Sequence, residues 1–571
     1  MSRKSPFSRL TIRIMGEKSG NLDLVRGRVV LLATFFVVFY LVVMVRVVDA
    51  TIIQGLFSEA ESYIGAPQAD AGSASQNSTF RADVIDRNGV LLATSLKTAS
   101  LHADPKNILN PVDTAKGLVK IFPEISYGEI LKKLQSEKRF VWIKRNLTPN
   151  EQKKILELGE PGLVFDYDYR RFYPQGELSS HIVGYANIDG KGQAGIELSF
   201  NNLLRGSNDP LQLTIDVRLQ HIMKREIKAA MKAYTAKAGA GIIMDVHTGE
   251  VLAAVSLPDF NPHAPKTDAN SPEMFNRLTL GMYELGSTFK IFTTAALLEK
   301  KNFPLSKKYD TTEPVRMAGH TIHDYHPEKR PLSIPEIFMV SSNIGTVHMA
   351  QDVGTDGMKK FFSDLGLMSK MSFDIDEVGS PIIPNPWREI NTLTASYGHG
   401  IAVSPMQLTA ATCAIVNGGV KVNAHLVKQD KEPLATTRII SQQTSLKMRQ
   451  LMRLVVSHGT ARKANIAGYE VGGKTGTAQK NVRGRYDANK RIASFVGAFP
   501  IDNPQYAIMV MVDEPNPNAK SYGYATAGWV AAPAVGEIVS SVGSILGIKP
   551  EMEAADISDP LLKFVSEKGG H

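Results

Sequence analysis

Cysteine is almost absent from this chain of 571 residues, since Cys413 is the only one. No disulfide can therefore form within the chain, so its fold must depend on a hydrophobic core, which the length allows. The neighbours Ala410, Ala411, Ala414 and Ile415 are small or apolar. They predict that Cys413 is a small buried residue without a catalytic role.

Outside the N-terminal tail, the chain also lacks a large excess of basic charge. The net charge is +9, but residues 1–28 hold seven Lys or Arg against Glu17 and Asp23, so more than half of the excess lies in that short tail. The remainder of the chain is nearly balanced. No basic stripe with interleaved aromatic residues remains, and we expect no nucleic-acid partner.

An uncharged apolar run covers residues 29–45, between Arg28 and Arg46. Such a run spans roughly 25 Å as a helix, and the flanking arginines can extend its reach. We expect a single membrane anchor at residues 29–48, with a secretory signal peptide as the alternative. The basic tail, residues 1–28, would then stay in the cytoplasm and the rest of the chain would cross the membrane.

The region after the anchor divides into a linker and two folded modules. Residues 49–79 include a stretch rich in Ala, Gly, Ser and Gln, which predicts a linker. Residues 80–212 form a first module that opens with a hairpin turning at Asn88-Gly89. Residues 213–548 form the second module, and residues 549–571 a polar tail.

The second module has strand patterns near both of its ends. Apolar residues at helical spacing over 219–234 and 535–546 predict helices that pack on a sheet. A mostly helical insert lies between the two groups of strands. The predicted strands cover residues 241–245, 250–256, 493–497 and 506–512.

Three short strings carry the chemistry: Ser287-Thr-Phe-Lys290, Ser341-Ser-Asn343 and Lys474-Thr-Gly-Thr477. A serine hydroxyl needs a neighbouring base and a pocket of donors for the oxyanion. The apolar residues 289–298 predict a buried helix that begins at Ser287, where backbone N–H groups favour an anion. The spacing of three places Lys290 on the same face as Ser287, and burial would lower its pKa enough for it to act as a base.

Two other sites compete with this interpretation. Residues 468–475 match the phosphate-loop pattern G-x-x-x-x-G-K-T, but a polar stretch precedes them and a glycine-containing, non-helical one follows. Their small residues instead fit a strand edge that a peptide substrate approaches closely. His320, His323, Asp324 and His326 could be mistaken for a zinc site, but their segment is rich in turn residues. We expect solvated histidines there, and neither a metal nor a cofactor.

The three strings, in this order, resemble the signature of the penicillin-recognising serine acyltransferases. Strings in the first module resemble the pedestal, or dimerisation-type domain, of class B penicillin-binding proteins. That resemblance implies an α/β (α+β) transpeptidase fold, in which an antiparallel sheet is flanked by helices and joined by a helical subdomain. An elongated pedestal and one transmembrane helix would precede it. The pedestal strings are Arg81 with residues 86–89, residues 171–174, residues 181–185 and residues 195–197.

The resemblance also implies roles for the site residues. Ser287 would be the acylated nucleophile, Lys290 its base, Ser341 a proton relay toward the leaving group and Lys474 the residue that orders this network. The oxyanion would bind backbone N–H groups of Ser287 and Thr477. The substrate's amide would bind Asn343, and its terminal carboxylate would bind the strand edge of Thr475, Gly476 and Thr477.

A further residue, His399, would shape the cleft in this family. Leu285 departs from the pattern, since many division enzymes have proline there, but the change removes no catalytic group. Capping of the helix that follows residue 343 is the alternative role for Ser341.

The implied function is D,D-transpeptidation, which cross-links peptidoglycan stem peptides from a lipid-linked precursor and is trapped by β-lactams. Within class B the resemblance favours the division-specific enzyme, with the elongation-specific enzyme as the alternative and a β-lactamase as a weaker one. The location would be the bacterial inner membrane, with the catalytic domain on the periplasmic side. A SEDS-type glycosyltransferase and other division proteins would be partners.

Overall fold

The computed structural model describes residues 33–41, 44, 80–268, 270–300, 303–429, 437–482, 485–552 and 556–566. The chain divides into two units, Met1–Ser73 and Ala74–His571. In the first unit the described residues, 33–41 and 44, are helical. The expected tail, the ends of the expected anchor and the linker lie outside the described residues. None of the described helices has the length and apolar character that a membrane crossing requires.

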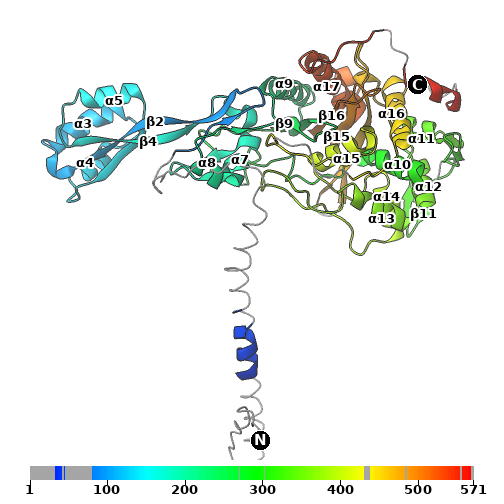
Figure 1. Cartoon of the computed structure of the whole chain (residues 1–571), viewed down its shortest axis with the longest axis horizontal. Coiled ribbons are helices and arrows are strands. Elements are labelled where there is room, and N and C mark those ends of the chain that lie inside the picture. The colour runs from blue at the N-terminus through cyan, green and yellow to red at the C-terminus, as the bar shows by residue number, and fades with distance from the viewer. Residues whose placement is uncertain are drawn as a thin grey trace, which may run out of the picture. The chain divides into compact units, whose positions relative to one another are not determined.

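A five-stranded antiparallel sheet forms the centre of the second module, as predicted (Figure 1). One hairpin from the start of the module and three consecutive antiparallel strands from its end join where Tyr506 pairs with Asp245. The predicted division of the strands between the two ends is therefore confirmed. In sheet order the strands are β14 (Gly472–Val482), β15 (Arg485–Phe499), β16 (Tyr506–Asp513), β8 (Ala238–Asp245) and β9 (Val251–Leu257).

Helices cover the sheet on both faces. The predicted helix after residue 217 is α9 (Val217–Ala233), and Gly239 and Gly241 of β8 leave room for its Ile227 and Met223. α17 (Ala527–Val542) packs beside α9 against β15 and β16. The other face is covered by α15 (Pro405–Val416) and α16 (Gln442–Ser457), and Cys413 of α15 is fully buried there, as predicted.

The final helix is shorter at its C-terminal end than the sequence pattern predicts. Ile545 and Leu546 lie beyond the end of α17 and still pack against the core. Gly543 and Gly547 explain the early end, because glycine is a poor helix former and Gly547 has a φ of +75°.

Helices are the main regular elements of the insert between β9 and α16, but fewer than half of its described residues are helical, so the prediction of a mostly helical insert is only partly confirmed. The insert carries α10, which follows the serine string, and α11 and α12, which meet at the Ser341-Ser342-Asn343 string. Short strand pairs connect these helices. The helices are α10 (Lys290–Lys300), α11 (Ile334–Val340), α12 (Asn343–Val353), α13 (Thr355–Asp364) and α14 (Glu389–Ala395). The strands are β10 (Lys308–Tyr309), β11 (Val315–Met317), β12 (His320–Ile322) and β13 (Leu332–Ser333).

The first module is built around a long strand, β2 (Leu91–Ala103). The predicted hairpin is present, because Gly89 turns with a φ of +86° between β1 and β2. A second, separate hydrophobic cluster lies between this sheet and helices α3 to α5. The other strands of this sheet are β1 (Val84–Ile85), β3 (Val141–Leu147), β4 (Leu163–Phe172) and β7 (Leu211–Gln212), and β5 (Tyr185–Ala186) and β6 (Gly192–Ala194) form a separate pair. The helices are α3 (Pro111–Ile121), α4 (Tyr127–Leu134), α5 (Pro149–Leu156), α6 (Ser180–Val183), α7 (Gly195–Ser199) and α8 (Asn201–Gly206).

The charged residues of the pedestal strings form a buried structural network. Glu197 accepts a 2.6 Å hydrogen bond from Arg81 Nε through one oxygen and another from Arg171 Nε through the other. All three residues are buried, and Arg81 also donates to the carbonyl of Gly190. A buried charge is tolerated only when it is paired, so each of these residues holds its partner in place. The cluster thereby joins segments more than one hundred residues apart.

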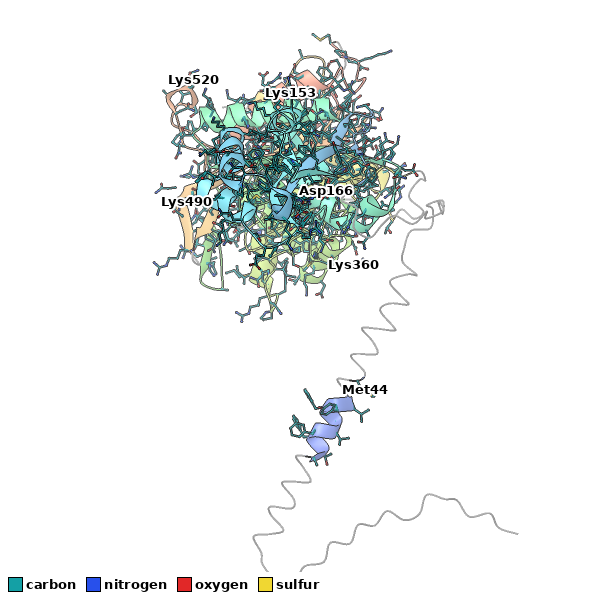
Figure 2. The ribbon with its side chains drawn as sticks, turned by 90° about the vertical axis from the view of Figure 1, so that its left-hand side faces the viewer. Met44, Lys153, Asp166, Lys360, Lys490 and Lys520 are labelled. Atoms are coloured by element: carbon teal, nitrogen blue, oxygen red, sulfur yellow. The ribbon has the colours of Figure 1, made fainter. Side chains whose placement is uncertain are left out.

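Two exposed lysines form ion pairs within their own helices. Lys153 and Lys360, labelled in Figure 2, lie at the outside of the folded unit, and more than three quarters of each side chain is exposed. Each lies four residues before an acidic partner on its own helix, Glu157 and Asp364 respectively. Such pairs contribute little to stability but keep the surface close to neutral.

Part of the expected polar tail is folded. The short 3-10 helix η7 (Asp559–Phe564) buries Leu561 and contacts α11 and α16. Arg453 of α16 donates a 2.8 Å hydrogen bond to Asp556, and Ser333 at the start of α11 donates one to the carbonyl of Phe564. The C-terminal segment therefore joins α11, which leads into the second string, to α16, which packs against β14.

Candidate active site

The serine string begins in a single 3-10 turn, η4 (Gly286–Phe289), that leads directly into α10. Ser287 is half-buried in this turn, and Phe289 and Phe292 behind it are fully buried. The predicted buried helix is therefore present. Gly286 has a φ of +55°, and a β-carbon there would lie 3.3 Å from the carbonyl oxygen of Thr477, which shows how closely the turn packs on β14.

Lys290 is fully buried at the start of α10. Its Nζ donates to the carbonyl oxygen of Ser341 at 2.5 Å, to Asn343 Oδ1 at 2.7 Å and to Ser341 Oγ at 3.2 Å. In the described residues its hydrogen bonds thus reach the second string and not the Ser287 hydroxyl. Burial, and then the charge of Lys474, hold the pKa of Lys290 well below its usual value, while Asp324 opposes this effect.

The second string lies at the junction of two helices. α11 ends at Ser341, which adopts the left-handed conformation with a φ of +65°. Ser342 caps α12 by accepting a 3.0 Å hydrogen bond from Gly345 N. Because Ser342 performs the capping, the alternative role for Ser341 is excluded, and its hydroxyl is available to the two lysines.

Lys474 completes this cluster from the edge strand β14. It is fully buried, and its Nζ donates to Ser341 Oγ at 2.9 Å. Burial lowers the pKa of Lys474 to about 7. Lys290 and Lys474 therefore share one hydroxyl, and the low pKa values favour a neutral amine, which can accept a proton near neutral pH.

The remaining residues of the third string continue along β14, beside the serine turn. A β-carbon at Gly476 would lie 2.3 Å from the carbonyl oxygen of Leu285, so only glycine allows this approach. Thr475 Oγ1 is 2.6 Å from Thr460 Oγ1, and Thr477 Oγ1 accepts a hydrogen bond from the first N–H of α17, at Ala527. Since the Thr477 oxygen acts as an acceptor, its hydroxyl proton can still be donated to a ligand.

The phosphate-loop alternative is excluded by the secondary structure. Residues 472–482 form one continuous strand, β14, at the edge of the sheet. A phosphate loop would require a helix directly after Thr475. The interpretation of this segment as a strand edge is confirmed.

Asp324 is a site residue that sequence reasoning missed. Its carboxylate accepts hydrogen bonds from Ser342 Oγ at 2.7 Å, from Ile344 N at 3.0 Å and from Asn343 N. It therefore fixes the start of α12 and, with it, the second string. The sequence placed Asp324 only in a turn-rich segment, and no local pattern links it to residues almost twenty positions away.

The histidines near Asp324 do not converge on it. His320, His323 and His326 are all exposed, as predicted. Among the described residues, no group of three possible ligands could hold a metal ion. His323 contributes instead through its backbone carbonyl, which accepts a 2.9 Å hydrogen bond from Asn343 Nδ2.

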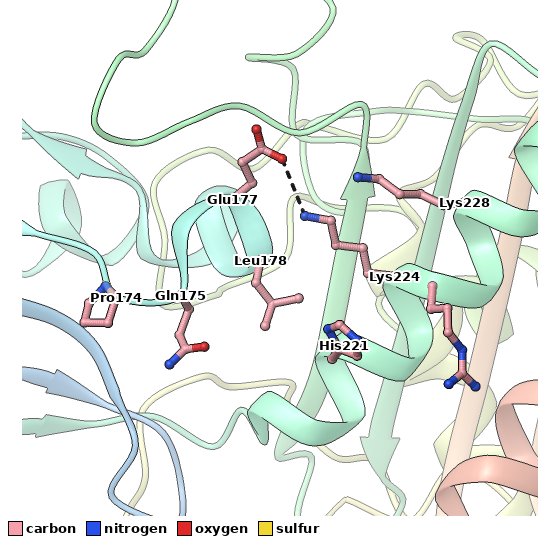
Figure 3. A pocket seen from close by; sticks show the side chains of 8 residues that line it. Pro174, Gln175, Glu177, Leu178, His221, Lys224 and Lys228 are labelled. Carbon is pink, nitrogen blue, oxygen red and sulfur yellow. Dashed lines mark ion pairs between the residues drawn. The ribbon is translucent and has the colours of Figure 1, made fainter.

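A surface pocket lies elsewhere in the molecule, between α9 and the short helix η3 (Gly176–Ser179) (Figure 3). Its lining includes His221 and Lys228, and Lys224 forms a 3.8 Å ion pair with Glu177 across it. It contains none of the residues of the three strings.

Two family models match the chain. The Penicillin binding protein transpeptidase domain matches residues 239–539, and the Penicillin-binding Protein dimerisation domain matches residues 77–239. These ranges contain the site described above and the pedestal network, respectively.

Individual relatives match over most of their length. The chain is 34% identical to the probable peptidoglycan D,D-transpeptidase FtsI of Caulobacter vibrioides, over 90% of this chain and 88% of the relative. It is 29% identical to the peptidoglycan D,D-transpeptidase FtsI of Escherichia coli, over 83% of this chain and 85% of the relative.

A solved structure has the same fold. Penicillin-binding protein 3 of Mycobacterium tuberculosis, solved with aztreonam, has a TM-score of 0.66 at 22% identity and covers 83% of this chain and 99% of its own. Together with the two domain matches and the relative at 34% identity, this likeness shows that the chain belongs to the penicillin-binding proteins with a transpeptidase domain.

Proposed function

We propose that this protein is a serine D,D-transpeptidase that cross-links the stem peptides of peptidoglycan during septal wall synthesis. The observation that carries the proposal is the meeting of all three strings at one place. Lys290 and Lys474 both donate to Ser341 Oγ, and Gly286 and Gly476 bring the serine turn against the edge strand.

The donor peptide would lie along β14, because an edge strand offers unpaired backbone groups to an extended chain. Thr475 and Thr477 would bind its terminal carboxylate, and Asn343 its amide. Ser287 Oγ would attack the carbonyl carbon of the penultimate D-alanine. The oxyanion would accept hydrogen bonds from the backbone N–H groups of Ser287 and Thr477.

Proton transfer follows from the lysine cluster. A neutral Lys290 would take the proton from Ser287 Oγ, and Ser341 would pass a proton to the departing D-alanine amine. Lys474 would hold Ser341 in place for this transfer. The low pKa of Lys474 supports its place in this proton-transfer network, since a group that titrates near neutral pH can give and take protons readily.

The covalent step has a direct test. Membranes that contain the wild type should label with a fluorescent penicillin at one site per chain, whereas Ser287→Ala should not label. The matched control is Ser363→Ala, which alters an exposed serine on α13 and should label like the wild type. Covalent labelling of the Ser287→Ala variant would show that the nucleophile is a different residue.

A septal role is the favoured cellular assignment, and both FtsI relatives support it. Depletion of the protein should produce filamentous cells, because septal cross-linking would stop while elongation continues. Rounded cells would instead support the elongation-specific alternative. A β-lactamase would release the penicillin label within minutes, so a stable label would exclude that alternative.

The location is part of the same proposal. The apolar run and the basic tail before it support a single anchor in the inner membrane, with residues after 50 on the periplasmic side. A SEDS-type glycosyltransferase and other division proteins would then act beside the anchor and pedestal. Protease treatment of intact spheroplasts should digest the catalytic domain and spare an epitope at residues 1–28.

A further inference from the structure

Three side chains from separate segments meet beside the serine turn. Tyr486, on β15 near the β14–β15 turn, donates its hydroxyl to the two carboxylate oxygens of Glu284 at 3.1 and 3.0 Å. Its ring stacks on the imidazole of His399, with centroids 5.6 Å apart and planes inclined by 26°. Glu284 and His399 are half-buried, and Tyr486 is 45% exposed, so the group lies at the surface of the site.

Backbone packing fixes this group next to Ser287. Glu284 precedes Ser287 by only three residues, and Gly398 precedes His399 directly. A β-carbon at Gly398 would lie 2.1 Å from the carbonyl oxygen of Gly286, so the two backbones are in contact. The segments are also joined by a pair of hydrogen bonds between the backbones of Tyr283 and Val403.

The hydrogen-bond partners of the Glu284 carboxylate are neutral: the phenol of Tyr486 and the backbone N–H of Gly400. Among the residues that the structure describes, this carboxylate forms no ion pair with lysine, arginine or histidine, and a neutral phenol is its side-chain partner. The lysines of the site, Lys290 and Lys474, are directed instead to Ser341. A half-buried carboxylate without a cation is a favourable binding site for an ammonium group.

We propose that Glu284, held by Tyr486 and His399, binds the ammonium group of the acceptor strand and removes its proton. This assignment rests on the proposed function, which requires an amine to attack the acyl-enzyme. A primary amine of a stem peptide is protonated at neutral pH, since such groups have a pKa of roughly 10. It must therefore lose a proton before its nitrogen can act as a nucleophile.

The proton and bond changes balance within the site. The ammonium gives one proton to the Glu284 carboxylate, and the free amine attacks the carbonyl carbon of the Ser287 ester. The new C–N bond forms, the C–Oγ bond breaks, and the second nitrogen proton passes through Lys290 to Ser287 Oγ. Glu284 then releases its proton to water, and the enzyme returns to its starting state.

The environment of Glu284 suits this task. Burial raises the pKa of its carboxyl above the usual value, although hydrogen bonds from Tyr486 and from the backbone N–H of Gly400 oppose the rise. A carboxylate with a raised pKa is a stronger base. Burial, and then the charge of Lys290, lower the pKa of His399. The imidazole is therefore neutral and does not compete with the ammonium for the carboxylate.

The acceptor role separates from the donor role in one experiment. The full-length protein in detergent is acylated by a thioester analogue of the D-Ala-D-Ala donor, with D-alanine as the acceptor amine, and the ratio of aminolysis to hydrolysis products is measured. Glu284→Gln keeps the size and the acceptor oxygen but removes the charge. We expect this ratio to fall at least tenfold, while the rate of acylation changes less than threefold.

Two further variants complete the design. Tyr486→Phe keeps the ring stack and loses the hydroxyl, so the ratio should fall by a factor of about five, which corresponds to the roughly 1 kcal/mol that an average hydrogen bond contributes. Glu537→Gln, on an exposed position of α17, makes the same chemical change away from the site and should leave the ratio at the wild-type value. Penicillin labelling of each sample verifies that the domain is folded.

The outcomes distinguish the acceptor site from the proposed function. If the wild type forms no acyl-enzyme, the transpeptidase assignment fails and the acceptor site fails with it. If acylation is normal and Glu284→Gln retains the wild-type ratio, the acceptor site alone is refuted. A parallel loss of acylation and aminolysis in Glu284→Gln would also refute it, because the carboxylate would then position the serine turn.

Discussion

Replacing Lys474 by methionine should stabilise the protein and remove its activity. Lys474 is fully buried in β14, and burial lowers its pKa from 10.5 to about 7. The unfolded chain holds a proton on this amine far more readily than the folded protein does. Methionine is an unbranched side chain of comparable length without a charge, so it removes this penalty while filling the space.

The penalty depends on pH in a defined way. A lowered pKa in the folded state costs stability at every pH below the unfolded pKa, and linkage gives about 4 kcal/mol at pH 7 for this shift. At pH 10 the same relation leaves only about 1 kcal/mol, because the unfolded chain also begins to lose the proton. Loss of the hydrogen bond to Ser341 costs about 1 kcal/mol. The variant should therefore gain about 3 kcal/mol at pH 7 and nothing measurable at pH 10.

Urea unfolding followed by tryptophan fluorescence measures this difference. Trp387 and Trp529 report on the transpeptidase domain, and Trp142→Phe in all samples removes the pedestal signal. Lys520→Met, at an exposed position, is the control and should show no pH-dependent gain. Penicillin labelling of Lys474→Met should fall at least a hundredfold. The reasoning is refuted if the variant is less stable at pH 7, or if its advantage is equal at pH 7 and pH 10.

Three other substitutions test separate parts of the structure. Asp324→Asn should slow penicillin acylation about tenfold and cost about 1–2 kcal/mol of stability, because charged hydrogen bonds to the start of α12 are lost. Glu197→Gln should destabilise the protein by about 3–5 kcal/mol in urea unfolding, since Arg81 and Arg171 lose their buried partner. Gly398→Ala should abolish penicillin labelling, because a methyl group cannot fit against the Gly286 carbonyl oxygen.

A specific outcome would contradict each of these predictions. Wild-type acylation by Asp324→Asn would mean that Ser342 alone fixes the second string. A loss below 1 kcal/mol for Glu197→Gln would mean that water reaches the arginine pair. Normal labelling by Gly398→Ala would show that the loop can move away from the serine turn, and it would weaken the acceptor site as well.

Local patterns predicted the elements of the catalytic module well. Alternating or continuous apolar residues specified the four strands at the two ends of the module and the helix after residue 217, because apolar residues recur at the spacing of the buried face of each element. The end of α17 was less well predicted, since Ile545 and Leu546 are apolar but follow Gly543. Burial there comes from packing of a turn, which has no helical period.

The candidate site also contains some residues that local patterns predict and others that they do not. Ser287, Lys290 and Lys474 could be singled out because their strings occur in a fixed order and their neighbours are apolar or small. Asp324 and Tyr486 could not, because each acts through a partner distant in the sequence. Local spacing could not predict the hydrogen bonds of Lys290 either, since they join α10 to the junction of α11 and α12.

The sequence by itself determined which residue types are available for acyl transfer and that the fold requires no disulfide. Only the tertiary structure decided that Ser341 Oγ bridges two buried lysines, and that Glu284, beside Ser287, forms its side-chain hydrogen bonds with the neutral phenol of Tyr486. The physical reason is the separation along the chain between the groups that interact. Periodicity and spacing report contacts within a few residues, whereas burial, pKa and charge compensation depend on groups brought together from across the chain.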